Sequence, residues 1–169
     1  MNGIAFTLRA LHHGERHLAG QLTAVAERHR TEHEVHHVAR DLAAWSRAHV
    51  ADLAEAARAH GLDLDGPPGA PATGATGATG VLSTLREKAA EAVGRRPEPG
   101  LLLLRDLREL HLSAAENSLY WEMLAQAAQA TKDDELLAVG SSCHPQTLRQ
   151  MRWTNTLIKN LSPQVLTSP

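Results

Sequence analysis

The sequence predicts an all-α fold, and three observations support that prediction. Alanine and leucine, both strong helix formers, supply 53 of the 169 residues, as 28 Ala and 25 Leu. Only five residues are aromatic, and valine and isoleucine are sparse, so there is little material for a β-sheet. Apolar residues recur instead at intervals of three and four positions, the period of an amphipathic helix. A β-sandwich, a barrel and a doubly wound α/β fold are therefore not expected.

The first half of the chain predicts a helical hairpin over residues 4–60. The apolar stripe of residues 4–30 ends in an Arg-His-Arg triplet, whose positive charge suits a helix C-terminus. Thr31 and Glu34 have the spacing of a capping box, which predicts that a second helix starts there. Gly61 is a good helix stop. We expect two antiparallel helices joined by a very short turn.

The segment 61–100 differs in composition from the rest of the chain. It holds eight of the 12 glycines and five of the eight prolines. An Ala-Thr-Gly triplet repeat over 72–80 is typical of a flexible linker, and a short helix is expected over 81–94. After this linker, residues 101–161 predict a second helical hairpin with its turn near Thr131. The buried side of its first helix is expected at Leu103, Leu107, Leu110, Ala114, Trp121, Leu124 and Ala128.

Two prolines bear on the last helix of the second hairpin. Pro145 has no backbone N–H to donate, so we expect the helix to kink or break there. Pro163 is expected to follow the end of the helix, near Leu161. Two long hairpins joined by an irregular segment predict one domain, residues 1–169, folded as a four-helix bundle. The joining segment is long enough to run the length of the bundle, so a crossover connection and an up-down arrangement are both open.

Four polar residues interrupt the apolar stripes: Glu15, His49, Glu116 and His144. Counted from the two turns, Glu15 faces His49 in the first hairpin, and Glu116 faces His144 in the second. All four lie near the middle of their helices, so a rise of ~1.5 Å per residue places them near one level in the bundle. The pattern predicts a core layer of two carboxylates and two imidazoles. Such a layer could bind iron, manganese or zinc, or form a metal-free set of paired polar groups.

The other polar clusters have simpler interpretations. Four histidines surround the first turn: His29, His33, His36 and His37. His33 and His37 have the spacing of two imidazoles on one helical face, but a solvated surface is the ordinary reading of such a cluster. Cys143 raises a nucleophile hypothesis, although a lone helical cysteine is usually a small core residue.

Three segments resemble the bacterial ferritin-like stress-protein family of the YciE type. They are LHHGERHLAGQL (11–22), HVADL (49–53) and ENSLY (116–120). The resemblance covers both hairpins loosely. It implies a ferritin-like four-helix bundle of two long antiparallel hairpins, a di-iron site built mainly from carboxylates, and a role in stress responses.

Carried over residue by residue, the resemblance assigns Glu15 and Glu116 as carboxylate ligands. The remaining carboxylate positions of the family are occupied by residues of other types: Trp45, Ser113, Pro145 and Gln146. A di-iron centre needs about six side-chain ligands. The resemblance therefore implies a di-iron site that has degenerated.

Three functions follow from these observations. The first is a non-catalytic ferritin-like bundle, stress- or interaction-related, that acts through protein contacts as a homodimer. The second is a metal-binding ferritin-like protein with oxidase or metal-handling activity, in which Glu15, His49, Glu116 and His144 hold Fe, Mn or Zn. The third is a zinc-dependent bundle of the DinB type. That type expects a His-x-x-x-His pair late in the chain, whereas Leu148 stands four residues after His144.

The net charge, the cysteine count and the length of the apolar runs limit the cellular location and the partners that we expect. A net charge of −2 gives no basic face for a nucleic acid. Cys143 is the single cysteine, which excludes an internal disulfide and favours a reducing compartment. No apolar run approaches the roughly 20 residues of a membrane span, and residues 1–10 show no secretory signal. We expect a cytoplasmic protein that binds neither nucleic acid nor membranes.

Overall fold

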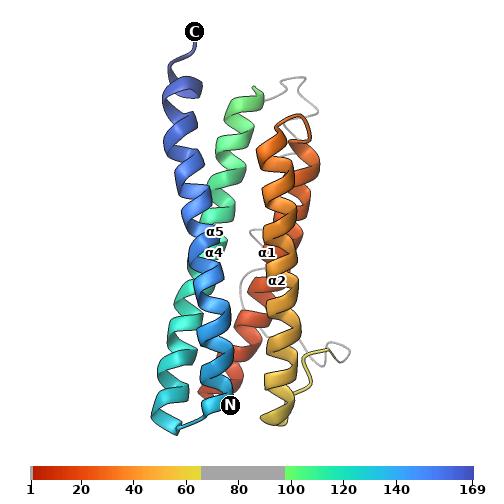
Figure 1. The fold of residues 1–169 in the computed structure, drawn as a ribbon, viewed down its shortest axis with the longest axis vertical. Helices are drawn as coiled ribbons and strands as arrows, with labels where there is room; N and C mark the ends of the chain where they lie inside the picture. Colours follow the sequence, from red (N-terminus) through yellow and green to blue (C-terminus); the bar gives the residue numbers. More distant parts are fainter. Residues whose placement is uncertain (1, 66–97) are drawn as a thin grey trace.

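The computed structural model describes residues 2–65 and 98–169. Within these residues the chain forms four long α-helices and no strand, so the all-α prediction is confirmed. The helices are α1 (Gly3–Arg28), α2 (His33–Ala59), α4 (Pro99–Thr131) and α5 (Asp134–Thr167). Figure 1 shows all four lying side by side along the long axis of the molecule. The expected repeat at 72–80 and the expected helix at 81–94 lie outside the described residues.

The helix ends follow local sequence signals in most places. The Asn2 side chain accepts a hydrogen bond from the backbone N–H of Ile4 and caps α1. The Asp133 side chain accepts one from Leu136 and caps α5. Gly61 has a φ of +70°, a left-handed conformation that glycine adopts without steric cost, and it follows the end of α2 as predicted. The capping box is wrong, because α2 is preceded by Glu32 and no side chain caps it.

The helix directions follow from contacts at the two ends of the bundle. His29, directly after α1, is hydrogen-bonded to Asp106 near the start of α4. His60, directly after α2, lies 3.0 Å from Asp133 at the start of α5. Thus α2 ends at one end of the bundle and α4 begins at the other, so α2 and α4 run in the same direction (Figure 1). A simple up-down arrangement, which the sequence left open, is excluded.

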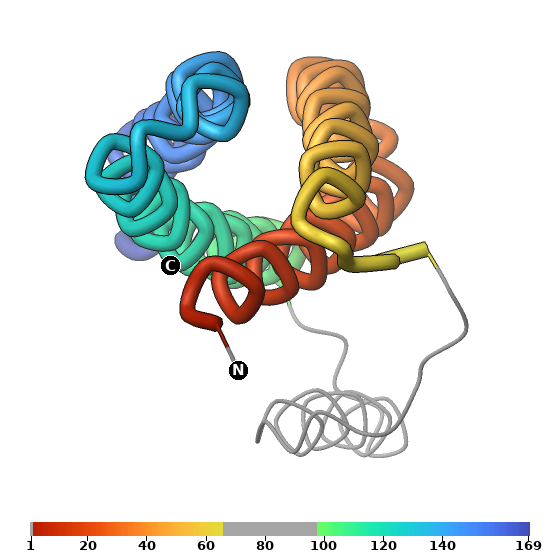
Figure 2. The backbone as a smooth tube through the Cα atoms, turned by 90° about the horizontal axis from the view of Figure 1, so that it is seen from below, coloured from red at the N-terminus to blue at the C-terminus, as the bar shows by residue number. Residues whose placement is uncertain are grey.

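The end-on view shows which helices are neighbours. α1 packs against α2 and α4, and α5 packs against α4 and α2 (Figure 2). Each of these neighbouring pairs is antiparallel, since α1 and α5 run opposite to α2 and α4. α4 lies between α1 and α5, and the side of α4 opposite the core faces away from the bundle.

The last helix is longer than the sequence predicts. α5 continues through Pro145 and Pro163 to Thr167, so the expectations of a break at Pro145 and of an end near Leu161 are wrong. A proline inside a helix removes one backbone hydrogen bond. Side chains of α5 are buried from Leu136 to Leu157, and this packing stabilises the helix across the missing bond.

The core consists of two hydrophobic clusters, one toward each end of the bundle. The first contains, among others, Leu18, Leu22, Leu42, Leu107, Leu110 and Leu157. The second contains Leu8, Leu11, Leu53, Trp121, Leu124 and Leu136. On every helix the residues between these two sets include buried polar side chains, among them Glu15, His49, Asn117 and Thr147. Polar groups therefore separate the two clusters at mid-height.

Candidate functional site: a buried polar layer

Glu15 and His49 face each other across the first hairpin, as their spacing predicts. The Glu15 side chain is fully buried, and His49 is only 1% exposed. His49 Nδ1 lies 3.2 Å from Glu15 Oε1 but is not aligned for a hydrogen bond. Each residue interrupts an otherwise apolar helical stripe, so helix packing carries both groups into the core.

The other two helices each add one partner to this pair. Trp121 on α4 donates a hydrogen bond from Nε1 to Glu15 Oε1 at 3.0 Å. Gln146 on α5 places Oε1 2.7 Å from His49 Nε2, which donates the hydrogen bond because an amide oxygen only accepts. The His49 ring also meets the Trp121 ring edge to face, with centroids 5.8 Å apart. We call Glu15, His49, Trp121 and the half-buried Gln146, one residue from each helix, the buried polar layer.

The protonation of His49 is set by opposing effects. Burial lowers the pKa of His49, but the Glu15 carboxylate, the hydrogen bond to Gln146 and the Asp52 carboxylate together raise it above the ordinary value of 6.5. A protonated His49 beside an ionised Glu15 is a buried ion pair. Such a pair stays in the core only when its remaining polar atoms are also satisfied.

Among the residues that the structure describes, three polar atoms around the buried polar layer find no hydrogen-bond partner. They are Glu15 Oε2, His49 Nδ1 and Asn117 Nδ2. Asn117 packs so closely against α1 that a Cβ at Gly14 would lie 2.1 Å from Asn117 Oδ1. Gly14 thus gives Asn117 the space it occupies. The centre of the bundle therefore contains buried polar atoms that form no hydrogen bond with the side chains described around them.

Cys143 lies beside the layer as a protonated thiol. It is 1% exposed, and its Sγ lies 3.7 Å from Asp52 Oδ2. Burial, together with the Asp52 and Glu15 carboxylates, raises the pKa of the thiol to about 12. Because the thiolate is the nucleophilic form, this environment does not support the nucleophile hypothesis.

The structure does not bring Glu116 or His144 to Glu15 and His49. Glu116 is exposed on the outer side of α4. The His144 side chain is 19% exposed, and its Nε2 pairs with Ser118 Oγ at 2.8 Å. The expectation of a four-residue core layer is therefore wrong for these two residues.

The physical reason is a shift of one position in each buried stripe. On α4 the inward positions are Ala114, Asn117 and Trp121, so Asn117 takes the place expected for Glu116. On α5 the inward positions include Cys143 and Thr147, which leaves His144 at the edge. Spacing predicts the buried side of α4 correctly, through Ala114 and Trp121, but Glu116 lies outside that side, next to the exposed Leu112 and Leu119.

The residues present do not fit a di-iron group. Within residues 2–65 and 98–169, no three histidine, cysteine, aspartate or glutamate side chains are grouped to hold a metal ion. The layer offers one carboxylate and one imidazole, and an indole and an amide complete it. An indole N–H is a donor only and cannot coordinate a cation. Near the first turn, the His37 ring lies 5.1 Å from the His33 ring and 5.0 Å from the His36 ring, but these three are not grouped to hold a metal ion.

Trp121 and Asn117 belong to this centre although the sequence pattern does not predict it. The spacing predicts Trp121 only as an apolar core residue, and an indole N–H carries no sequence signal for a carboxylate partner. Gln146, which the resemblance assigns to a carboxylate position, is half-buried and reaches the buried His49 through its hydrogen bond.

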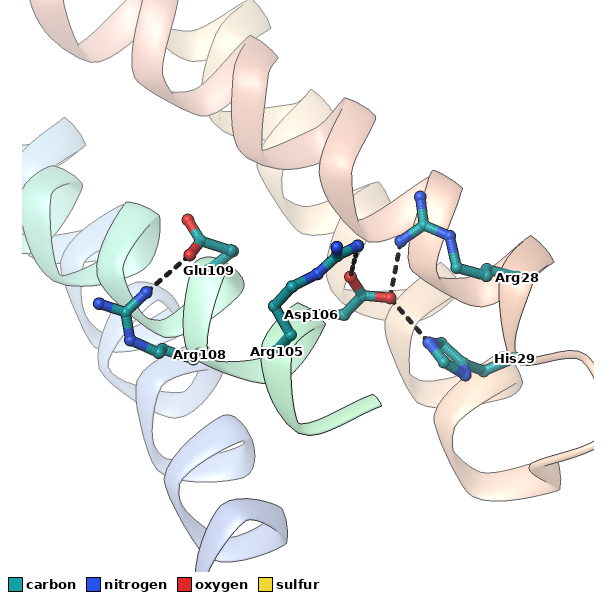
Figure 3. A network of polar contacts seen from close by, with 6 residues as sticks. All are labelled: Arg28, His29, Arg105, Asp106, Arg108 and Glu109. Carbon is teal, nitrogen blue, oxygen red and sulfur yellow. Dashed lines mark hydrogen bonds and ion pairs between the residues drawn. The ribbon is translucent and has the colours of Figure 1, made fainter. Parts of the chain in front are cut away.

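A second polar cluster, at the end of the bundle, holds α1 to α4. Asp106, with a side chain 5% exposed, accepts from Arg28 Nη1 and His29 Nε2, each at 2.7 Å to Oδ2. Arg105 lies 3.5 Å from Oδ1 of the same residue (Figure 3). Arg28 also lies in the last turn of α1, where positive charge is favourable. The cluster is a structural clamp between two helices.

Two further observations bear on function. In the part of the chain that the structure describes, no helix is both long and apolar enough to cross a membrane. No family model, no curated protein sequence and no solved structure matches this chain.

Proposed function

We propose that this chain is a ferritin-like four-helix bundle in which a hydrogen-bonded layer replaces the di-iron site. We further propose that it acts in the cytoplasm without catalysis, through protein contacts, in a stress- or interaction-related role. The helix directions support the fold part of this proposal, because ferritin-like bundles have one long crossover connection between their second and third long helices. The buried, protonated Cys143 thiol is compatible with a reducing compartment.

One observation carries the proposal: the hydrogen bond of 3.0 Å from the Trp121 indole to Glu15. By the resemblance, Glu15 is the helix-one ligand of a di-iron centre. Here its carboxylate is bound by a bulky aromatic donor from α4, which occupies the space in which further ligands would have to converge. The remaining contacts of the layer, to His49 and Gln146, are also made within the protein.

A second candidate is a protein that binds one Fe, Mn or Zn ion. The unpartnered Oε2 of Glu15 and Nδ1 of His49 favour it, because both atoms are buried and able to ligate. In this alternative Glu15 and His49 hold the ion, and Glu116 and His144 play no part.

Metal analysis distinguishes the two candidates. The protein is purified without a His-tag, reconstituted with Fe²⁺, Mn²⁺ or Zn²⁺, dialysed and measured by elemental analysis, with helicity followed by circular dichroism. The proposal expects no metal that depends on Glu15 or His49, so wild type, Glu15→Gln and His49→Gln should hold equal amounts. Stoichiometric metal in the wild type that both variants lose while folded would contradict the proposal and support the second candidate.

The surface histidines require their own control. The imidazole pair of His33 and His37 can retain metal weakly. A His33→Ala variant removes that pair without touching the core. Metal that this variant loses belongs to the surface and does not count for either candidate.

A further inference from the structure

α4 has apolar side chains on two opposite sides. Its inward side is buried in the bundle through seven apolar residues: Leu103, Leu107, Leu110, Ala114, Trp121, Leu124 and Ala128. Its outward side exposes four more: Leu101 (44%), Leu112 (48%), Leu119 (68%) and Met123 (51%). Their spacings of eleven, seven and four residues place them on one line along the helix. We call this line the outer stripe.

The outer stripe is broader than one helix. The Phe6 ring of α1, itself 51% exposed, meets Tyr120 of α4 with centroids 6.3 Å apart. On the other flank, α5 exposes Leu148. The pairing of Ser118 with His144 puts Leu148, one turn further along α5, near the level of the middle of α4. Exposed apolar side chains on three neighbouring helices, with charged residues such as Arg105 and Arg108 between them, are typical of a protein interaction site.

Charged residues on the outer stripe are arranged symmetrically about Leu112. Arg108 lies four residues before Leu112 and Glu116 lies four residues after it, on the same side of the helix. If a second α4 packs antiparallel with Leu112 at the crossing point, each Arg108 faces the partner's Glu116. In the same register Leu101 faces the partner's Met123. Leu119 faces the partner's Arg105, whose aliphatic stem can cover it. The stripe is therefore complementary to itself in charge at Arg108 and Glu116, and in apolar character at Leu101, Leu112 and Met123.

Arg108 is available for such a pairing. Within the chain it contacts Glu109 at 2.7 Å (Figure 3), but both side chains of that pair are more than half exposed. Exposed ion pairs between neighbouring residues contribute little to stability. Arg108 could therefore leave Glu109 and pair with the partner's Glu116 at little cost in free energy.

We propose that the outer stripe of α4 binds a second copy of this chain in a symmetric, antiparallel dimer centred on Leu112. A two-fold dimer uses the same patch on both subunits, and this patch meets that requirement. The inference rests on the proposed role in protein contacts and names the partner. It does not depend on the metal content of the buried polar layer. The measurement of the oligomeric state and the metal analysis therefore test the two proposals independently.

Sedimentation velocity over a range of protein concentrations tests the dimer. The wild type should sediment as a dimer, and Leu112→Asp should raise the dissociation constant about 30-fold or more, as expected for a central contact. Leu166→Asp is the matched control, because Leu166 is 65% exposed near the C-terminal end of α5 and should leave the dimer intact. A wild type that is monomeric at every concentration would overturn the proposal.

Charge reversal tests the register. Arg108→Glu and Glu116→Arg should each weaken the dimer by about tenfold, because each puts like charges opposite one another at two places. The double variant restores both pairs and should return to the wild-type dissociation constant. Single variants that weaken the dimer without rescue in the double variant would overturn the antiparallel register. Melting temperatures measured in parallel show whether any variant acts on folding instead.

Cross-linking tests the two-fold axis directly. Leu112→Cys places two thiols at the crossing point, and mild oxidation should give a disulfide-linked dimer. The native Cys143 is buried and its pKa is raised to about 12, so it does not compete. Leu166→Cys should give no comparable product. Equal cross-linking of both variants would mean random collision and would contradict the axis.

Discussion

The Trp121 indole on α4 donates its N–H to the carboxylate of Glu15 on α1, at 3.0 Å, and both side chains are fully buried. This bond ties the second hairpin to the first at the middle of the bundle. It also directs the one buried glutamate of the centre toward a donor that cannot bind metal. Under the function that we propose, the stability of the bundle and the replacement of the metal site therefore depend on the same contact.

Replacing Trp121 by phenylalanine should lower the free energy of unfolding by more than the smaller ring alone would, because the indole N–H is also lost. Trp121→Phe leaves Glu15 Oε1 without its donor, and we expect the free energy of unfolding to fall by about 3 kcal/mol. Trp153→Phe is the matched control, because Trp153 Nε1 has no hydrogen-bond partner. That variant should lose only about 1 kcal/mol. Urea unfolding measures both, and equal losses would show that the bond to Glu15 contributes nothing.

The stability contributed by His49 should fall as pH rises. Its pKa in the folded protein is raised above 6.5, the value expected when unfolded, so the folded state binds the proton more tightly. The contribution is fully present below about pH 6.5 and is lost as pH rises through the folded pKa. The stability difference between wild type and His49→Gln should accordingly be larger at about pH 5.5 than at about pH 8.5.

Glu15→Gln provides the control for this pH dependence. It removes the carboxylate that holds the proton on His49 while keeping a side chain of similar size. In this background, His49→Gln should change stability by nearly the same amount at both pH values. A pH dependence that survives in Glu15→Gln would assign the effect to another group.

Two glycines of α1 should respond oppositely to alanine. At Gly14 a Cβ would meet Asn117 Oδ1 at 2.1 Å, and Asn117 is buried with little room to move. The clash should exceed the gain in helix propensity, for a net loss of about 1–2 kcal/mol. At Gly20 a Cβ has no neighbour within 4 Å, so Gly20→Ala should stabilise the helix by up to about 1 kcal/mol. Thermal unfolding of both variants checks the prediction, and a stabilising Gly14→Ala would contradict it.

The Asp106 cluster should contribute more to the free energy of unfolding than a surface ion pair on the same helix. Asp106→Ala leaves His29 buried without its partner, and we expect a loss of about 2 kcal/mol, since Arg28 is partly exposed and can be solvated. Glu109→Ala breaks the exposed pair with Arg108 and should stay within about 0.5 kcal/mol of the wild type. Chemical denaturation compares them, and similar losses would rule out a special role for the clamp.

The first hairpin could be predicted from sequence almost completely. Its apolar stripe is narrow, so the polar residues Glu15 and His49 stood out at buried positions, and counting from a short turn placed them opposite each other. Gly61 marked the end of the hairpin correctly. When a helix has only one apolar side, the spacing of its apolar residues identifies the buried positions without ambiguity.

The second hairpin could not be predicted at the same level. On α4, Leu112 and Leu119 have the heptad spacing of a core stripe, but both are exposed. The true core stripe, through Ala114 and Trp121, lies on the opposite side of the helix. Spacing predicts this core stripe correctly, but it also shows a second apolar line on the other side of the helix. Glu116 lies between Leu112 and Leu119 on that second line, so the prediction that Glu116 is buried is wrong.

The direction of α4 sets a minimum length for the chain between Asp65 and Glu98. The 27 residues of α2 rise about 40 Å, and an extended chain spans at most about 3.4 Å per residue. Crossing the bundle therefore takes at least about 12 residues, and positions 66–97 provide 32. Roughly 20 residues are thus spare. A version shortened below the minimum could satisfy the same helix contacts only by exchanging hairpins between two chains, so the length of this segment decides whether the bundle closes on itself or becomes domain-swapped.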